Sequence, residues 1–158
     1  EFLSSLALRE NIWLENDIDL SESKWNGNYN YSGTINGNNH SITGIRCSFA
    51  ASPATGTNFA LFGVLSSAAH LYDLSITGVQ IDFTAMRFGD YKAALFAQEI
   101  MEGAKIENVT VSGRLTGRHG EGVEGVRMDL FPVCIEGNSD FPTCDFSGIT
   151  TENLTVGE

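Results

Sequence analysis

Short segments in which apolar and polar residues alternate recur along the chain. The clearest are Leu74–Ile76, Val109–Val111 and Leu154–Val156, each with a serine or threonine between two apolar residues. A period of two is typical of a β-strand that buries one of its faces. The pattern therefore predicts short strands at these three places.

The alternating segments belong to longer repeats. Phe59–Gly63 is similar to Ala93–Ala97 at an offset of 34 residues, and Leu71–Gly78 is similar to Ile106–Gly113 at an offset of 35. Leu71–Gly78 and Ile106–Gly113 each end in a glycine, where we expect the chain to turn. A repeat of this length predicts a solenoid whose turns stack their strands in parallel. An α/β sheet would need crossover helices between its parallel strands, and the repeats predict none.

A third copy of the repeat contains Met128–Phe131 and Thr151–Val156. Leu130 follows Leu95 by 35 residues, whereas Asn153 follows Asn108 by 45. We therefore expect an insertion of about ten residues, which forms a loop near positions 134–148.

The predicted insertion holds two of the three cysteines. Cys134 and Cys144 are close enough in sequence to form a local disulfide, with a free pair as the open alternative. Cys47 lies in an apolar stretch, and we expect it to be a buried small hydrophobic residue rather than a nucleophile.

One segment has the apolar spacing of a helix. In Phe2–Glu10, apolar residues at Phe2, Leu3 and Leu6 share one helical face. We expect residues 1–10 to cap the first turn of an all-β solenoid, and residues 11–158 to form about four turns. No comparable cap precedes the last residue, so we expect the stack to continue in a longer chain or to be closed by a partner.

Composition and charge exclude several classes of function. Hydrophobic residues make up 42% of the 158 residues and charged residues 18%, which predicts a folded chain. The net charge of −11 would repel nucleic acid and anionic membranes. The longest apolar stretch, around Phe59–Val64, is far shorter than the ~20 residues that span a bilayer.

Several blocks resemble the GLUG-type repeats of bacterial and eukaryotic surface proteins. The similar blocks are Asn16–Ser21, Tyr31–Ile45, Ala60–Gly63 and Leu74–Ile76, and the similarity covers about residues 11–111. The resemblance implies a right-handed parallel β-helix. It also implies a secreted or surface-anchored protein, often with an adhesin-like role.

Asparagines and one aspartate occupy equivalent positions of the repeats. Asp73, Asn108 and Asn153 should stack as a ladder, because these residues tolerate left-handed backbone and hydrogen-bond to neighbouring turns. Asn108 and Asn153 also begin N-glycosylation sequons, as do Asn30 and Asn39. In a eukaryotic host, Asn30 in its polar surroundings is the best candidate for a glycan.

Two other patterns are weaker candidates for ligands. The alternating carboxylates of Glu15, Asp17 and Asp19 could hold Ca²⁺, but a solvated acidic face is the preferred interpretation. Gly120–Gly125 matches the dinucleotide motif GxGxxG, but its glutamates would repel a pyrophosphate. The three histidines, His40, His70 and His119, also lack the spacing of a metal site. We expect no metal and no cofactor.

An enzyme remains the alternative, because parallel β-helices also host polysaccharide lyases and glycoside hydrolases. Such chemistry needs paired carboxylates or a cluster of acids and bases on one face. Asp82 and Asp90 are the candidate acids, and Arg87 or Lys92 the candidate charge stabilisers.

The sequence favours an extracellular or cell-surface module for structural display or adhesion. Its partner would be a protein or glycan on a host or community surface, and flanking domains of the same chain are expected. Recognition is expected in the loops that interrupt the repeat, namely Thr84–Lys92, Arg118–Val126 and Glu136–Phe146.

Overall fold

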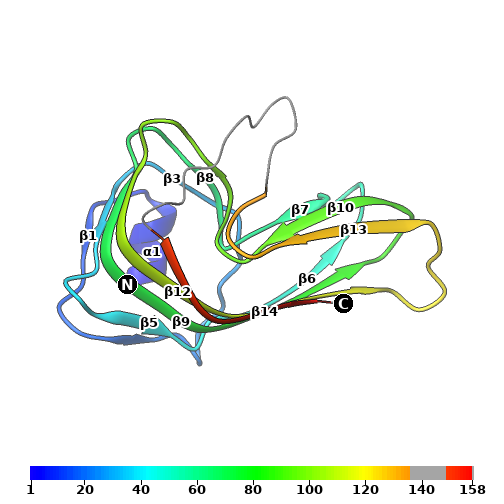
Figure 1. Cartoon of the computed structure of the whole chain (residues 1–158), viewed down its shortest axis with the longest axis horizontal. Helices are drawn as coiled ribbons and strands as arrows, with labels where there is room; N and C mark the ends of the chain where they lie inside the picture. Colours follow the sequence, from blue (N-terminus) through cyan, green and yellow to red (C-terminus); the bar gives the residue numbers. More distant parts are fainter. Residues whose placement is uncertain (136–148, 158) are drawn as a thin grey trace.

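The chain winds into a parallel β-solenoid of about three turns, with 56% of its residues in strands and one short helix at the N-terminus (Figure 1). This computed structural model describes residues 1–135 and the backbone of the strand 149–157. The predicted all-β solenoid is therefore confirmed, with about three turns in place of four.

The elements follow one another as α1 (Phe2–Ala7), β1 (Ile12–Trp13), β2 (Ile18–Asp19), β3 (Tyr29–Tyr31), β4 (Thr34–Asn36), β5 (Ser41–Thr43), β6 (Arg46–Ala51), β7 (Asn58–Phe59), β8 (Phe62–Leu65), β9 (His70–Ala85), β10 (Gly89–Ala94), β11 (Ala97–Ile100), β12 (Lys105–His119), β13 (Val126–Phe131) and β14 (Ile149–Gly157).

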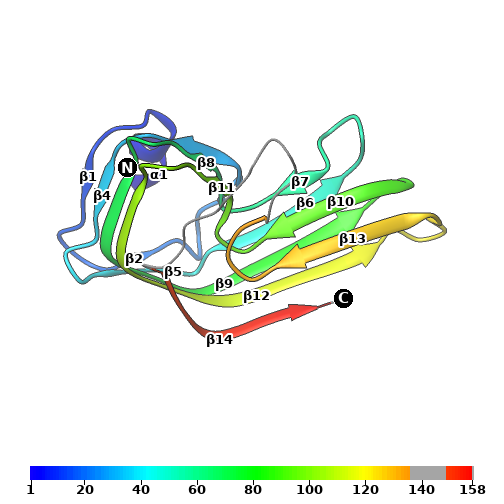
Figure 2. The same cartoon turned by 45° about the horizontal axis from the view of Figure 1, so that its top comes forward.

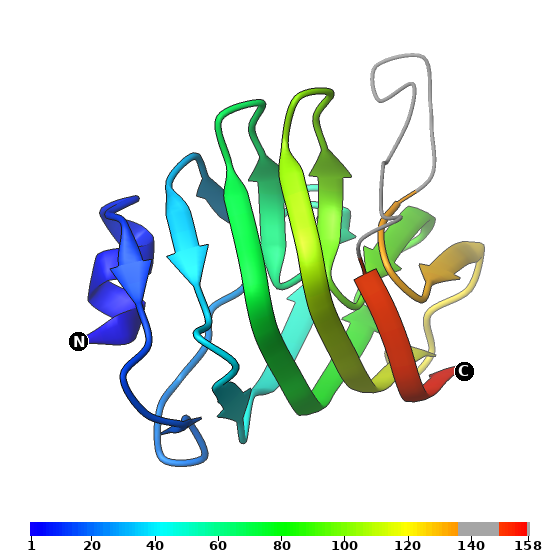
Figure 3. The same cartoon turned by 60° about the vertical axis from the view of Figure 1, so that its left-hand side comes forward.

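Three parallel sheets form the walls of the solenoid. The largest has the order β1-β4-β9-β12-β14, with β2 joined through β5 and with β5 and β6 also paired to β9. The two smaller sheets are β7-β10-β13 and β3-β8-β11. Figure 3 shows the long strands β9, β12 and β14 side by side.

The long strands turn corners without ending. In β9 the buried positions change from odd to even numbers at Asp73 and back to odd numbers after Gly78, and both of these residues have positive φ. A left-handed residue reverses the side-chain alternation, so the strand bends while its apolar side chains stay on the inner face. The glycine predicted to turn the chain thus forms a bend inside a continuous strand.

The predicted offsets are confirmed between the first two copies of the repeat. Ile106 pairs with Leu71 at the predicted offset of 35, and Ala93 pairs with Phe59 at the predicted 34. Within β12 the offset drops from 35 to 34 at the irregularity between Val111 and Gly113.

The predicted alignment of the third copy is wrong. Leu130 pairs with Ala93 rather than lying opposite Leu95, at an offset of 37. The offset reaches 40 where Ile149 pairs with Val109. The extra residues are thus divided between the β12–β13 connection and the segment after Cys134, so they do not form one insertion of about ten residues.

Helix α1 packs against the first turn, as the sequence predicts (Figure 2). Leu6 is fully buried, and the ring of Phe2 lies 6.1 Å from that of Trp25, between centroids. Trp25 also makes edge contacts with Tyr29 and Phe62. Among the residues that the structure describes, α1 is the only helix, and it is far too short to cross a bilayer.

Beyond the corner at Gly78 the solenoid flattens into two layers, which we call the arm. Its core is a group of aromatic side chains from both layers: Phe49 stacks on Phe59 at 4.9 Å and on Phe83 at 5.7 Å, and Tyr91 meets Phe83 edge-on at 6.1 Å. These rings fix the spacing of the layers and so position the loops at the far end of the arm.

Cys47 is buried, as the sequence predicts, and its thiol donates a hydrogen bond to the Trp25 carbonyl oxygen at 3.3 Å. Burial raises the pKa of the thiol to about 12, so the reactive thiolate is scarce at neutral pH.

We expect iodoacetamide to leave Cys47 unmodified in the folded chain and to alkylate it in urea, as measured by peptide mapping. Rapid alkylation of the folded chain would contradict this burial.

Candidate binding surface at the loop tip

Three connections meet at the far end of the arm, on the right-hand side of Figure 1. They are residues 52–57, 86–88 and 120–125, and we call them together the loop tip. Backbone hydrogen bonds stack them: Met86 donates to the Ala51 carbonyl oxygen at 2.8 Å, Gly120 to that of Ala85 at 2.8 Å, and Gly89 to that of Gly125 at 3.1 Å. The three loops therefore form one surface, and hydrogen bonds between successive turns hold their ends together.

The most exposed large apolar side chain in the described part of the chain lies at the loop tip. Phe88 is 75% exposed and Met86 is 49% exposed. The glycine-rich loop of the next turn lies beside them, because a methyl group built on Gly125 would be 3.6 Å from Phe88 Cβ. A phenylalanine and a methionine exposed together are typical of a protein contact surface.

Charges of both signs surround these apolar side chains. Arg87, Glu121 and Glu124 are exposed within the loop tip itself. Just behind it, Arg118 and Asp82 approach within 3.9 Å. A partner would thus meet an apolar centre with a mixed polar rim.

Two of the three predicted recognition segments contribute to the loop tip. Thr84–Lys92 contains residues 86–88, and Arg118–Val126 contains residues 120–125. Glu136–Phe146 lies outside the described residues. The connection 52–57 was not predicted from the sequence, because it interrupts no visible repeat.

The predicted catalytic group does not come together. Asp82 on β9 and Asp90 on β10 are the sequence neighbours of Phe83 and Tyr91, whose rings meet inside the arm. Since side chains alternate along a strand, the two carboxylates point away from the core on opposite layers. Lys92 shares the outer side of β10 with Asp90, and Arg87 lies at the loop tip.

The polar ladder forms in part. Asp73 and Asn108 both have left-handed backbone, with φ of 50° and 51°, and Asn108 Nδ2 donates to Asp73 Oδ1 at 2.7 Å. Asn153 was predicted to join them, and this is wrong: it lies between the pairs Ser112–Glu152 and Arg114–Thr155, beside Gly113. On the other side of Asp73, left-handed Asn39 contacts it through the backbone, because the Asn39 N–H donates to the Asp73 carbonyl oxygen at 2.9 Å.

The modification and disulfide predictions concern other surfaces. Asn30 is exposed on β3, and its Oδ1 accepts the Val64 N–H at 2.8 Å, so its use as a glycan acceptor stays a prediction. Cys134 is buried. Its bond to Cys144 also stays a prediction, because Cys144 lies outside the described residues.

The acidic residues near the N-terminus stabilise local backbone. Asp17 accepts the Ser41 N–H at 2.8 Å and lies 3.3 Å from His40 Nδ1, and the Ser41 hydrogen bond is the main reason why the pKa of Asp17 is lowered. The pKa of Asp19 is lowered in the same way by the Ser21 N–H. Within the described part of the chain, no three His, Cys, Asp or Glu side chains are placed to share a metal ion.

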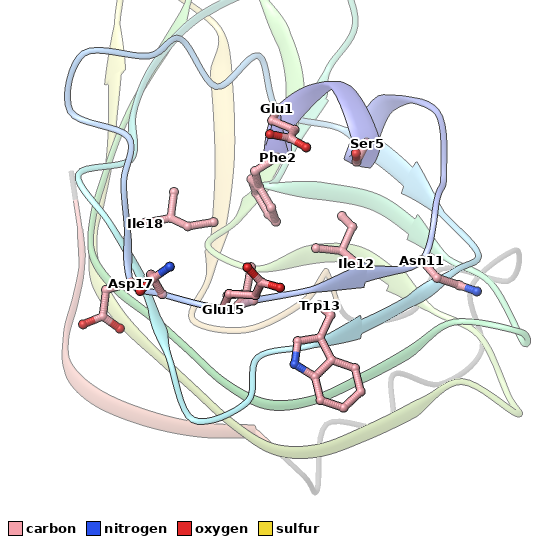
Figure 4. A pocket seen from close by; sticks show the side chains of 11 residues that line it. Glu1, Phe2, Ser5, Asn11, Ile12, Trp13, Glu15, Asp17 and Ile18 are labelled. Atoms are coloured by element: carbon pink, nitrogen blue, oxygen red, sulfur yellow. The ribbon is translucent and has the colours of Figure 1, made fainter.

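A hollow of 460 Å³ lies between α1 and the first two strands. Figure 4 shows that Phe2, Ile12 and Ile18 point into it, whereas Trp13 lies on the opposite side of β1. The lining also includes polar residues, among them Glu1, Ser5 and Glu15, so the hollow is a mixed polar and apolar recess at the capped end of the solenoid.

The motif at Gly120–Gly125 leads into strand β13 and not into a helix. A helix N-terminus is the part of a dinucleotide site that binds the pyrophosphate, so the sequence-based rejection of this site agrees with the structure.

In comparisons with known proteins, the chain matches no protein-family model, no curated protein and no solved structure.

Proposed function

We propose that the chain is a secreted or cell-surface module of the GLUG-repeat type that displays its loop tip for adhesion to a protein or glycan surface. The observation that carries the proposal is the exposure of Phe88 and Met86 at the end of a hydrogen-bonded stack. Aromatic side chains and methionine are enriched where proteins bind partners.

The rigidity of the arm supports this proposal. Because its aromatic core fixes both layers, little conformational entropy is lost when a partner docks on the loops. The net charge of −11 favours partners with basic patches and disfavours polyanions. The alternative, a lyase or glycoside hydrolase, lacks a supporting observation, since Asp82 and Asp90 face opposite ways.

Substituting Phe88→Ser should lower partner binding by about tenfold or more, because an exposed aromatic anchor often dominates an interface. The measurement is retention on arrays of glycans and of extracellular protein domains, together with reducing-end assays on acidic and neutral polysaccharides. We expect retention without new chain ends.

The matched control is Leu8→Ser, which removes an apolar side chain that is similarly exposed but follows α1 at the capped end. It should leave retention unchanged. Equal retention of the Phe88→Ser variant and the native chain on the array of protein domains would refute the loop tip as the binding surface, and new chain ends would support the enzyme instead.

A further inference from the structure

A second surface lies on the outer side of the largest sheet, at the capped end of the solenoid. Trp13, Asn36, Tyr72 and Glu107 are paired in register on the neighbouring strands β1, β4, β9 and β12. The residues before them in sequence are apolar and line the inside, so these four side chains face outward. We call them the aromatic row.

Trp13 and Tyr72 are two strands apart in the row. Strands are spaced by about 4.8 Å, which separates their backbones by roughly 9.6 Å. Asn36 between them is only 6% exposed, and its Oδ1 accepts the Asn38 N–H at 2.8 Å, so its amide turns toward the corner of the coil. The two rings are thus separated by about the length of two linked sugar rings, with the Asn36 amide recessed between them.

The rings of the row are held in different ways. Trp13 is 64% exposed and lies on the outer side of β1 in Figure 4. The ring of Tyr72 is 4.5 Å from that of His70, and His70 Nε2 lies 2.8 Å from Glu107 Oε2. These contacts hold the tyrosine ring and place hydrogen-bonding groups beside it.

We propose that the aromatic row binds an extended neutral oligosaccharide. The C–H face of a sugar ring is weakly positive and packs on the negative face of an aromatic ring, while the sugar hydroxyls need acceptors and donors at the edge. Glu107 and His70 supply these groups. Charge selects the ligand class, because Glu107 and the net charge of −11 repel uronic acids and sulfated sugars. The site is separate from the loop tip, and its test does not depend on that of the proposed function.

The experiment is calorimetric titration of the whole chain with cellohexaose, N-acetylchitohexaose and mannohexaose, and with hexagalacturonate as the anionic comparison. At least one neutral hexasaccharide should bind and hexagalacturonate should not. Trp13→Ala and Tyr72→Ala should each lower the affinity about tenfold or more, as expected when one stacking ring is lost. Trp13→Phe and Tyr72→Phe keep a ring and should keep most of the affinity.

Tryptophan emission gives a second measurement, because Trp13 is exposed and Trp25 is only 2% exposed. The binding ligand should shift the emission of the native chain and leave that of the Trp13→Phe variant unchanged. Phe88→Ser, at the loop tip, should bind the hexasaccharide normally. Failure of all neutral sugars to bind, binding of hexagalacturonate alone, or unchanged affinity in both alanine variants would each overturn the proposal.

Discussion

Replacing Gly37 by alanine is expected to destabilise the solenoid strongly. The new Cβ would overlap the carbonyl oxygen of Asp73 and lie 2.5 Å from Leu74 Cα. Both atoms belong to the backbone of β9, which cannot move aside without breaking its pairing with β4 and β12. We expect a loss of about 3 kcal/mol or more in the free energy of unfolding, measured by urea denaturation.

The control for this variant is Gly78→Ala. Gly78 has a φ of 65° but no atom within 4 Å of its Cβ position, so alanine there costs backbone strain alone, about 1–2 kcal/mol. If Gly37→Ala were no more harmful than Gly78→Ala, the close approach of the second and third turns would be wrong.

Substituting Trp25→Ala should destabilise the chain by about 3–5 kcal/mol, since it leaves a large cavity in the core. The indole touches α1 through Phe2 and the second turn through Phe62, and its Nε1 donates to the Leu61 carbonyl oxygen at 3.2 Å. One side chain thus joins the cap to two turns. Urea denaturation monitored by circular dichroism measures the loss.

The same substitution at Trp13 provides the matched control. Trp13 is exposed on the outer face, so Trp13→Ala should change the free energy of unfolding by no more than about 0.5 kcal/mol. Similar losses at Trp13 and Trp25 would contradict the packing of Trp25 between the cap and the turns.

Much of the fold follows from the spacing of similar segments. Strand pairing in a solenoid joins equivalent residues of successive turns, so offsets of 34 and 35 residues predict the pairing of Leu71 with Ile106 and of Phe59 with Ala93. The helical spacing of Phe2, Leu3 and Leu6 likewise predicts the cap.

The third copy could not be aligned from its sequence. A Leu-Phe pair at Leu130 fits two registers, and apolar similarity cannot decide between them. Hydrogen bonding between β10 and β13 selects the register with three more residues in the preceding connection. That connection lies at the loop tip, where added residues meet solvent and disturb no pairing.

The aromatic row was invisible in the sequence for a related reason. Trp13 pairs with Asn36 at an offset of only 23 residues, since the first turn lacks a long strand, whereas Asn36 pairs with Tyr72 at 36. No repeat of 34 or 35 residues relates the two rings. A search for unequal first turns beneath a capping helix could have aligned them.

The uniform parallel pairing of the turns also has a mechanical consequence. Strands lie across the solenoid axis, so the hydrogen bonds between turns point along it. A pull along the axis therefore loads these bonds in tension, one turn after another, instead of shearing a whole sheet at once. Each turn of about 35 residues that peels away releases up to about 120 Å of extended chain. A chain pulled from both ends would thus lengthen in steps and dissipate mechanical energy while its remaining turns stayed folded.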